Sequence, residues 1–138
     1  MEEIYSSRYI EVKYSEPDKL LEVVWKNDLL ELDVDEYKRQ AYKMVEALYD
    51  YDVNLVLQDA LEAVYPLTES LNTWIKSNIS KAFIENSVKK IAYIMPQDII
   101  TQLGLELLVQ TAQEEYSGPE RRFFSSYEEA QKWLFEKE

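Results

Sequence analysis

The feature that most constrains the fold of this chain is the strand-like run from Val88 to Met95, which ends at Pro96. Its second part, Ile91 to Met95, carries no charged side chain. An apolar run of this length is typical of a strand in a sheet that is covered on its faces. We therefore expect a sheet with helices packed over it.

A helix is predicted directly after this strand, with Asp98 as its capping residue. The residues expected on its inner face are Ile100, Leu103, Leu107, Leu108, Thr111 and Ala112, with Leu105 and Val109 broadening that face. Gly104 falls within the same stripe. Because glycine costs about 1 kcal/mol relative to alanine inside a helix, we expect it to serve close packing of this helix on the sheet.

Two alternating segments near the start of the chain predict an antiparallel hairpin. Residues 9–14 and 21–26 each alternate between apolar and polar side chains, as half-buried strands do. The segment between them contains Pro17 and Asp18, which favour a turn.

Two helices and one strand are predicted between this hairpin and Val88. Asp33 and Glu36 are typical of the start of a helix. Its expected core positions are Tyr37, Ala41, Met44, Val45 and Leu48. A buried strand is expected at 53–57, before a helix whose inner face holds Leu67, Leu71, Trp74, Ile75 and Ile79.

A turn, a strand and a helix are predicted at the end of the chain. Gly118 and Pro119 predict a turn, and residues 121–125 predict a last strand. Ser126 and Glu129 form a capping box that begins a final helix. The residues expected to face inward from it are Ala130, Trp133 and Leu134.

These elements give the order β-β-α-β-α-β-α-β-α, without an internal repeat or a linker. Strands that alternate with helices after a hairpin predict a mixed sheet whose later strands run parallel. We therefore expect residues 1–138 to form a single α/β domain with a five-stranded mixed sheet packed with helices.

Composition narrows the class of protein. With 46% hydrophobic and 30% charged residues, the chain is globular in character. It begins without a secretory signal, and no stretch approaches the ~18 consecutive apolar residues of a membrane span, so we expect a cytoplasmic protein. The net charge of −12 repels phosphate backbones, so nucleic acid is not an expected partner.

The chain contains no histidine, no cysteine and only 2 glycines. This excludes Ser-His-Asp and Cys-His catalytic arrangements, thiolate metal sites and glycine-rich phosphate loops. The acidic residues Glu46, Asp50 and Asp52 lack the spacing of a calcium-binding loop. No catalytic residue, metal site or cofactor is therefore predicted.

The order of elements resembles the SpoIIAA-like group of the STAS superfamily, the sulfate-transporter and anti-sigma-factor-antagonist fold. The resemblance extends over residues 8–136, and the segment from Phe124 to Leu134 is similar to the closing strand and helix of those proteins. Further positions similar to that group are Trp25, Asp59, Trp74 and the segment 96–98.

The resemblance implies a small non-enzymatic module that binds a partner protein or a small ligand. Regulatory members carry a phosphorylatable serine in an Asp-Ser-Ser-Gly-like loop after the third strand, whereas this chain has Asp59, Ala60, Leu61 and Glu62 there. The usual phosphorylation switch is therefore not expected. Thr68 and Ser70 are nearby hydroxyls, but hydroxyls near a helix start usually cap it.

Asp59 and Asp98 are the candidate polar site residues. Both follow strands that are predicted to be parallel, at the edge of an α/β sheet where ligands usually bind. If the two strands are neighbours, the carboxylates could share a crevice for acid/base chemistry or a hard cation. The alternative is that Asp98 caps its helix and Asp59 binds loop amides.

Aromatic residues are the other candidates. The chain contains 11 tyrosines, of which Tyr42 and Tyr49 lie on the shoulder of the first helix and could form a partner surface. Trp74 and Tyr93 could line a pocket for an apolar ligand. The alternative for all four is a structural position in or beside the core.

We therefore expect a non-enzymatic cytoplasmic module that binds a partner protein, with a homodimer as a further candidate assembly. The alternative function is a carrier of a small ligand or lipid, because this broad fold type also resembles CRAL-TRIO lipid-binding domains. An enzyme that uses only carboxylates and tyrosine ranks last. The interaction hypothesis predicts an exposed aromatic patch, and the carrier hypothesis predicts a closed apolar pocket.

Overall fold

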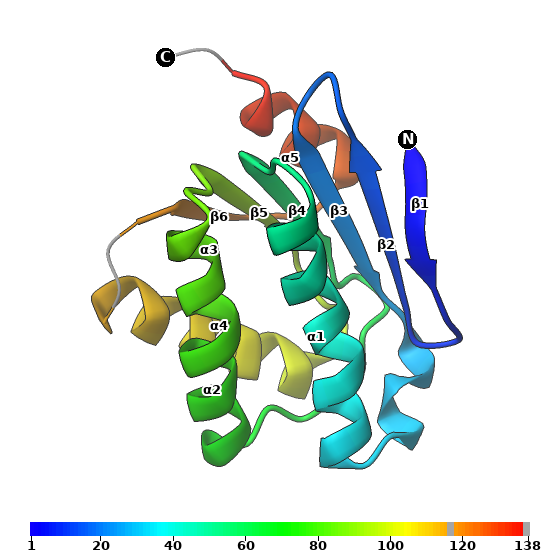
Figure 1. Cartoon of the computed structure of the whole chain (residues 1–138). Helices are drawn as coiled ribbons and strands as arrows, with labels where there is room; N and C mark the ends of the chain where they lie inside the picture. Colours follow the sequence, from blue (N-terminus) through cyan, green and yellow to red (C-terminus); the bar gives the residue numbers. More distant parts are fainter. Residues whose placement is uncertain (116–117, 137–138) are drawn as a thin grey trace.

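The strands lie side by side in the order in which they occur along the chain. In the computed structural model, which describes residues 1–115 and 118–136, they form one mixed sheet of six strands (Figure 1). The strands are β1 (Glu2–Ser6), β2 (Ile10–Ser15), β3 (Leu20–Trp25), β4 (Leu55–Asp59), β5 (Lys90–Ile94) and β6 (Glu120–Phe124). Strands β1 to β3 pair antiparallel, and β3 to β6 pair parallel.

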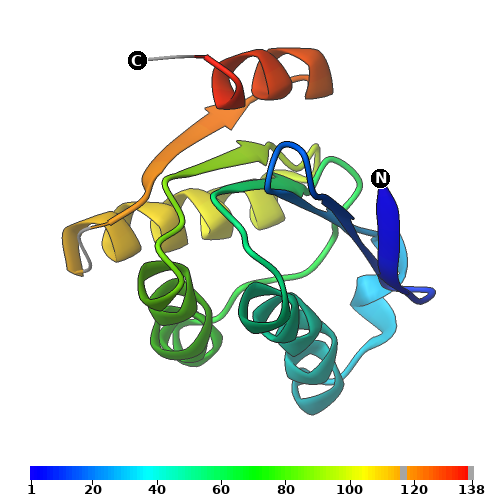
Figure 2. The same cartoon turned by 45° about the horizontal axis from the view of Figure 1, so that its top comes forward.

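The helices divide unequally between the two faces of the sheet. They are η1 (Asn27–Glu31), α1 (Val34–Asp50), α2 (Glu69–Ile75), η2 (Lys76–Ser80), α3 (Lys81–Glu85), α4 (Ile99–Glu115) and α5 (Tyr127–Leu134). Segment η2 is π-helical, so α2, η2 and α3 form one continuous helical rod. Figure 2 shows α1, this rod and α4 on one side of the sheet and α5 alone on the other. Crossovers of one hand between parallel strands produce this arrangement.

The α/β class, the mixed sheet and the antiparallel hairpin of β2 and β3 confirm the sequence expectations. The expected count of five strands is wrong, because β1 is added at the edge. Its five residues lack a buried alternating face, and only Ile4 and Tyr5 are half-buried. Pairing with β2 makes this segment a strand, through a register that shifts between Glu3 and Tyr5.

The predicted caps are present at the helix starts. The Asp33 carboxylate accepts a hydrogen bond from the Glu36 amide at 2.8 Å, and the Ser126 hydroxyl accepts one from the Glu129 amide at 3.3 Å. Each satisfies an amide that has no partner within its helix. The predicted inner faces of α1 and α5 are buried as expected.

The two faces of the sheet enclose two separate cores. The larger lies between the sheet and the layer of α1, the α2–α3 rod and α4, and residues such as Val23, Val56 and Ile91 supply its sheet side. The smaller lies under α5, where Trp133 and Leu134 pack on Leu57 and Ala92. Side chains alternate between the two cores along β3, β4 and β5, as a doubly covered sheet requires.

Helix α4 is rotated relative to the sequence expectation. Its buried residues are Thr101, Leu108, Val109 and Ala112. Four large aliphatic side chains are exposed instead: Ile99 by 65%, Ile100 by 64%, Leu103 by 59% and Leu107 by 55%. The placement of Ile100, Leu103 and Leu107 on the inner face is therefore wrong. Because apolar residues occur all round this helix, periodicity alone did not fix its inner side.

Gly104 permits a close approach, but not the one expected. A Cβ atom at this position would lie 3.2 Å from the Leu67 Cβ. Leu67 belongs to the connection between β4 and α2, so the glycine lets α4 pack against this connection rather than against the sheet.

The rotation of α4 predicts unequal costs for two leucines on the same helix. We expect L108A to lower the free energy of unfolding by about 2–5 kcal/mol, because it leaves a cavity in the core. We expect L103A to change it by no more than about 0.5 kcal/mol, because Leu103 is mostly exposed. Urea unfolding at equilibrium measures both. Equal costs, or a larger cost for L103A, would contradict the orientation of α4.

Candidate functional site

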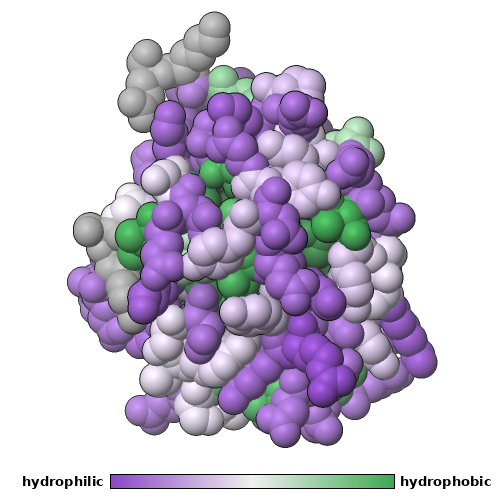
Figure 3. Space-filling model, viewed as in Figure 1, coloured by the Kyte–Doolittle hydropathy of each residue, from purple (hydrophilic) through white to green (hydrophobic). Residues whose placement is uncertain are grey.

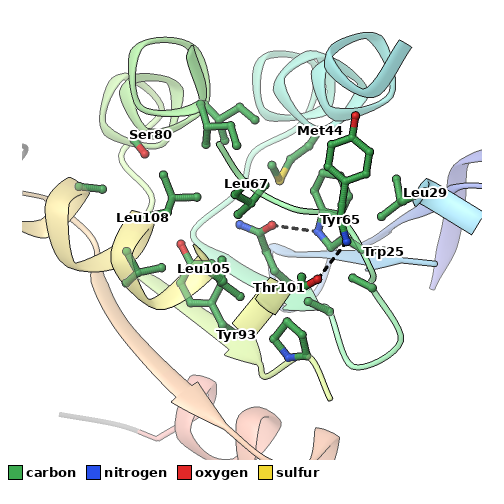
Figure 4. A pocket seen from close by; sticks show the side chains of 18 of the residues that line it. Trp25, Leu29, Met44, Tyr65, Leu67, Ser80, Tyr93, Thr101, Leu105 and Leu108 are labelled. Atoms are coloured by element: carbon green, nitrogen blue, oxygen red, sulfur yellow. Dashed lines mark hydrogen bonds between the residues drawn. The ribbon is translucent and has the colours of Figure 1, made fainter. Parts of the chain in front are cut away.

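An apolar cavity of about 80 Å³ lies inside the larger core (Figure 4). Trp25, Gln58 and Tyr93 line its sheet side, and each stands at or one residue before the carboxyl end of its strand. Gln58 and Tyr93 are register partners on neighbouring parallel strands. This edge of an open α/β sheet is where ligands usually bind.

Three aromatic rings form a ladder along one wall of the cavity. The Trp25 and Tyr37 rings lie 6.0 Å apart at an interplanar angle of 21°. The Tyr37 and Tyr65 rings are 4.4 Å apart at 11°. Burial raises the pKa of the Tyr37 hydroxyl, so the ladder is neutral across the physiological pH range.

Hydrogen bonds hold this wall to both the sheet and α4 (Figure 4). The Trp25 indole nitrogen donates to the Gln58 side-chain oxygen at 3.1 Å. The Tyr65 amide donates to the Thr101 hydroxyl oxygen at 3.0 Å, and that hydroxyl donates to the Asp98 carboxylate at 2.7 Å. The three residues Tyr65, Thr101 and Asp98 therefore link the β4–α2 connection to the start of α4.

The structure gives Asp59 and Asp98 separate partners. The Asp59 carboxylate accepts a hydrogen bond from the Leu61 amide at 3.2 Å. The Asp98 carboxylate accepts one from the Thr101 amide at 3.0 Å as well as the hydroxyl bond, and these bonds lower the pKa of Asp98. The two carboxylates do not share a hydrogen-bonding partner, and each matches its structural alternative. Within the described ranges, no group of three or more acidic side chains is placed to hold a metal ion.

Trp74 and Tyr93 are not brought together at the cavity. Tyr93 lines it and is buried, and its ring packs against Phe123 at 5.4 Å. Trp74 is half-buried on α2, where the Lys38 ammonium lies 5.4 Å from its ring centroid. Trp74 therefore packs beside the core, and the cavity is formed by other aromatic residues.

Tyr42 and Tyr49 are exposed on α1, by 45% and 57%. The Tyr49 hydroxyl donates a hydrogen bond to Glu85 of α3. Figure 3, which has the same orientation as Figure 1, shows this side of the molecule as mainly hydrophilic, with hydrophobic residues in small separate areas. The two tyrosines are thus accessible to a partner.

A continuous apolar surface is present on α4 instead. We name it the α4 apolar face, and it consists of Ile99, Ile100, Leu103 and Leu107. Their spacing places them on neighbouring turns along one side of the helix. Single exposed leucines are ordinary, but a row of four aliphatic side chains, each more than half exposed, is typical of an interaction surface.

Acidic residues outnumber basic residues around α4. Neither α4 nor the adjoining connection, residues 60–68, contains a lysine or an arginine. Their acidic residues are Glu62, Glu106, Glu114 and Glu115, and Asp98 precedes the helix. Glu115 is paired with Lys76 at 2.9 Å and Arg121 contacts Gln113, so the rim is negative mainly through Glu62, Asp98 and Glu106.

The opposite face of the sheet holds a buried carboxylate. Glu22 of β3 is 5% exposed, and the Tyr127 hydroxyl of α5 lies 2.8 Å from both of its carboxylate oxygens. The Gln131 amide in turn donates to the Tyr127 oxygen at 2.9 Å. Burial raises the pKa of Glu22, and the tyrosine hydrogen bond and Lys13 on β2 oppose this effect in part.

Comparisons with known proteins add no functional assignment. No family model matches the chain, and no curated protein or solved structure matches it either. In the part of the chain that the structure describes, no helix is long and apolar enough to cross a membrane.

Several residues of these sites were not expected from the sequence. The excess of apolar residues on α4 is a signal that could have indicated a second apolar face. Gln58 follows three apolar residues of β4, which could have marked it as a buried polar group. Glu22 alternates with apolar residues in a segment that was predicted to be a half-buried strand, and no local pattern indicates that α5 covers it.

The raised pKa of Glu22 predicts how stability changes with pH. Because the folded state holds this proton more tightly than the unfolded state, protonation stabilises the fold. The gain in unfolding free energy begins as the pH falls through the raised pKa, and it is complete below the ordinary value of 4.5.

We therefore expect E22Q to be more stable relative to wild type at pH 7 than at about pH 4.5. Urea unfolding of both proteins across this range measures the difference, and the other carboxylates are common to both. E106Q, on the exposed side of α4, controls for the loss of one negative charge. A difference that does not vary with pH would contradict the assignment of a raised pKa.

Proposed function

We propose that this protein is a non-enzymatic module that binds a partner protein through the α4 apolar face. The observation that carries the proposal is the exposure, by 55–65%, of four aliphatic side chains on one helix. Burying apolar area is the main favourable term in protein association, and such a row suits a helix packed along α4. The interaction hypothesis from the sequence is therefore kept. The proposed binding surface, however, is on α4 and not at Tyr42 and Tyr49.

The acidic charge around the α4 apolar face indicates which kind of partner binds there. The rim is acidic and contains no lysine or arginine on α4 or the 60–68 connection. A second copy of the chain would bring the same acidic rim and a further net charge of −12, which opposes self-association. We propose that the occupant is an amphipathic helix of a partner protein, with basic residues beside its apolar side.

The architecture supports the further proposal that the fold is SpoIIAA-like. Each parallel strand of the sheet is followed by a helix, and the crossover helices share one face. In keeping with that resemblance, we propose a regulatory role without the usual serine switch. Thr68, one of the two nearby hydroxyls, accepts a hydrogen bond from the Leu71 amide at 3.3 Å and so caps α2.

A synthetic peptide provides a direct probe of this face. The peptide carries leucines on one helical side and lysines beside them, and its binding is followed by fluorescence anisotropy. We expect saturable binding that weakens as salt rises, because the rim charges are exposed. We expect L103E to weaken binding by about tenfold or more, because a carboxylate would then lie in the buried centre of the interface.

Two matched controls separate this face from general attraction. L30E places the same charge at a leucine on η1 with nearly the same exposure, 58% against 59% for Leu103, and we expect it to bind as wild type does. A peptide with the same leucines but with glutamates beside them should not bind. Equal weakening by L30E and L103E would overturn the proposal. So would a wild-type dimer that L103E dissociates, since a second copy would then be the occupant.

A further inference from the structure

Gln58 and Ser80 are two of the polar residues that line the cavity, and both are buried. Gln58 is 8% exposed, and its oxygen accepts from Trp25, but no acceptor among the described residues takes its amide hydrogens. Ser80 is 5% exposed, and its hydroxyl has no hydrogen bond within the same described part of the chain. Polar groups that line a cavity and lack a protein partner are available to a bound molecule.

Ser80 differs from two threonines in the same helical layer. Thr73 and Thr111, on α2 and α4, donate their hydroxyl hydrogens to the carbonyl four residues earlier. Ser80 ends the π-helical segment η2 and makes no such bond, and it lines the cavity together with Ile79. Figure 4 shows Ser80 and Leu108 at the same end of the cavity. Single π-helical turns frequently occur at functional sites.

The rest of the lining fixes the chemistry of an occupant. No lysine, arginine, aspartate or glutamate is among the residues that line the cavity. A charged ligand would therefore lose its hydration without gaining a counter-ion. The volume of about 80 Å³ is roughly half that of a cavity of about 150 Å³ that holds benzene. Leu67 and Leu105 are half-buried, so this part of the wall is nearest to the surface.

We propose that this cavity is a binding site for a small, neutral and mainly apolar molecule that carries one hydrogen-bonding oxygen. The Gln58 amide donates to that oxygen, and the Ser80 hydroxyl supplies a second polar contact. The ring ladder of Trp25, Tyr37 and Tyr65 packs against the apolar part. A ring-sized ligand needs more than the volume of this cavity, so Leu67 and Leu105 move apart to admit it and the cavity widens around it. This site is independent of the α4 apolar face, whose side chains point away from the core.

Phenol and toluene are matched probes for this site, since they have nearly the same shape and toluene carries a methyl group where phenol carries a hydroxyl group. We expect both to give saturable shifts of backbone amide signals around the cavity, including those of Tyr65 and Thr101, in NMR titrations. We expect phenol to bind about threefold to tenfold more tightly than toluene, the effect of one neutral hydrogen bond. In Q58L this preference should disappear, whereas Q97L, at an exposed glutamine, should retain it.

A second variant keeps the test valid if Q58L does not fold, because Q58L also removes the acceptor for Trp25. Ala112 lines the cavity from α4, and A112L fills it, so we expect A112L to bind neither probe. The proposal is overturned if neither probe binds saturably to the wild type, or if A112L binds them unchanged. It is also overturned if phenol retains its preference in Q58L, or if only ordered water enters the cavity.

Discussion

The structure depends on one topological constraint: four parallel strands, β3 to β6, that follow each other in both sequence and space. Each step from one strand to the next requires a crossover, and crossovers of one hand place their helices on one face. Helix α1, the α2–α3 rod and α4 therefore share that face, and α5 must cover the other (Figure 2). Both candidate sites follow from this crowding. The cavity lies where the three helical segments meet over the sheet, and α4 contacts the layer with only one of its two apolar sides.

Two buried polar side chains stand on opposite faces of the same sheet, and the structure treats them differently. Glu22 is paired with Tyr127, and this bond joins α5 to β3 across a large separation in sequence. Gln58 is paired on one side only, through Trp25. A fully satisfied buried group specifies packing. Glu22 therefore attaches α5 to the sheet, whereas Gln58 is the group through which we propose that the cavity binds a ligand.

Sequence patterns predicted the elements well where one physical signal dominated. The caps at Asp33 and Ser126 and the inner faces of α1 and α5 were predictable, because each combined a start signal with a single apolar stripe. Edge strand β1 was missed because its pairing, rather than its own apolar pattern, forms it. The orientation of α4 was missed because apolar residues surround that helix. Tyr93 lines the cavity, but its neighbours there depend on tertiary packing that local periodicity does not encode.

Helix α4 turns Leu103 and Leu107 outward and Leu108 and Ala112 inward, and both the fold and the proposed docking surface depend on this orientation. The absence of cysteine from the chain makes single-cysteine variants free of background, so the rate of reaction with a thiol reagent measures the exposure of each position. The structure requires fast reaction at positions 103 and 107, close to the rate in the unfolded chain, and strong protection at 108 and 112. Protection at 103 and 107 in the isolated protein would contradict this orientation and remove the α4 apolar face as a docking surface.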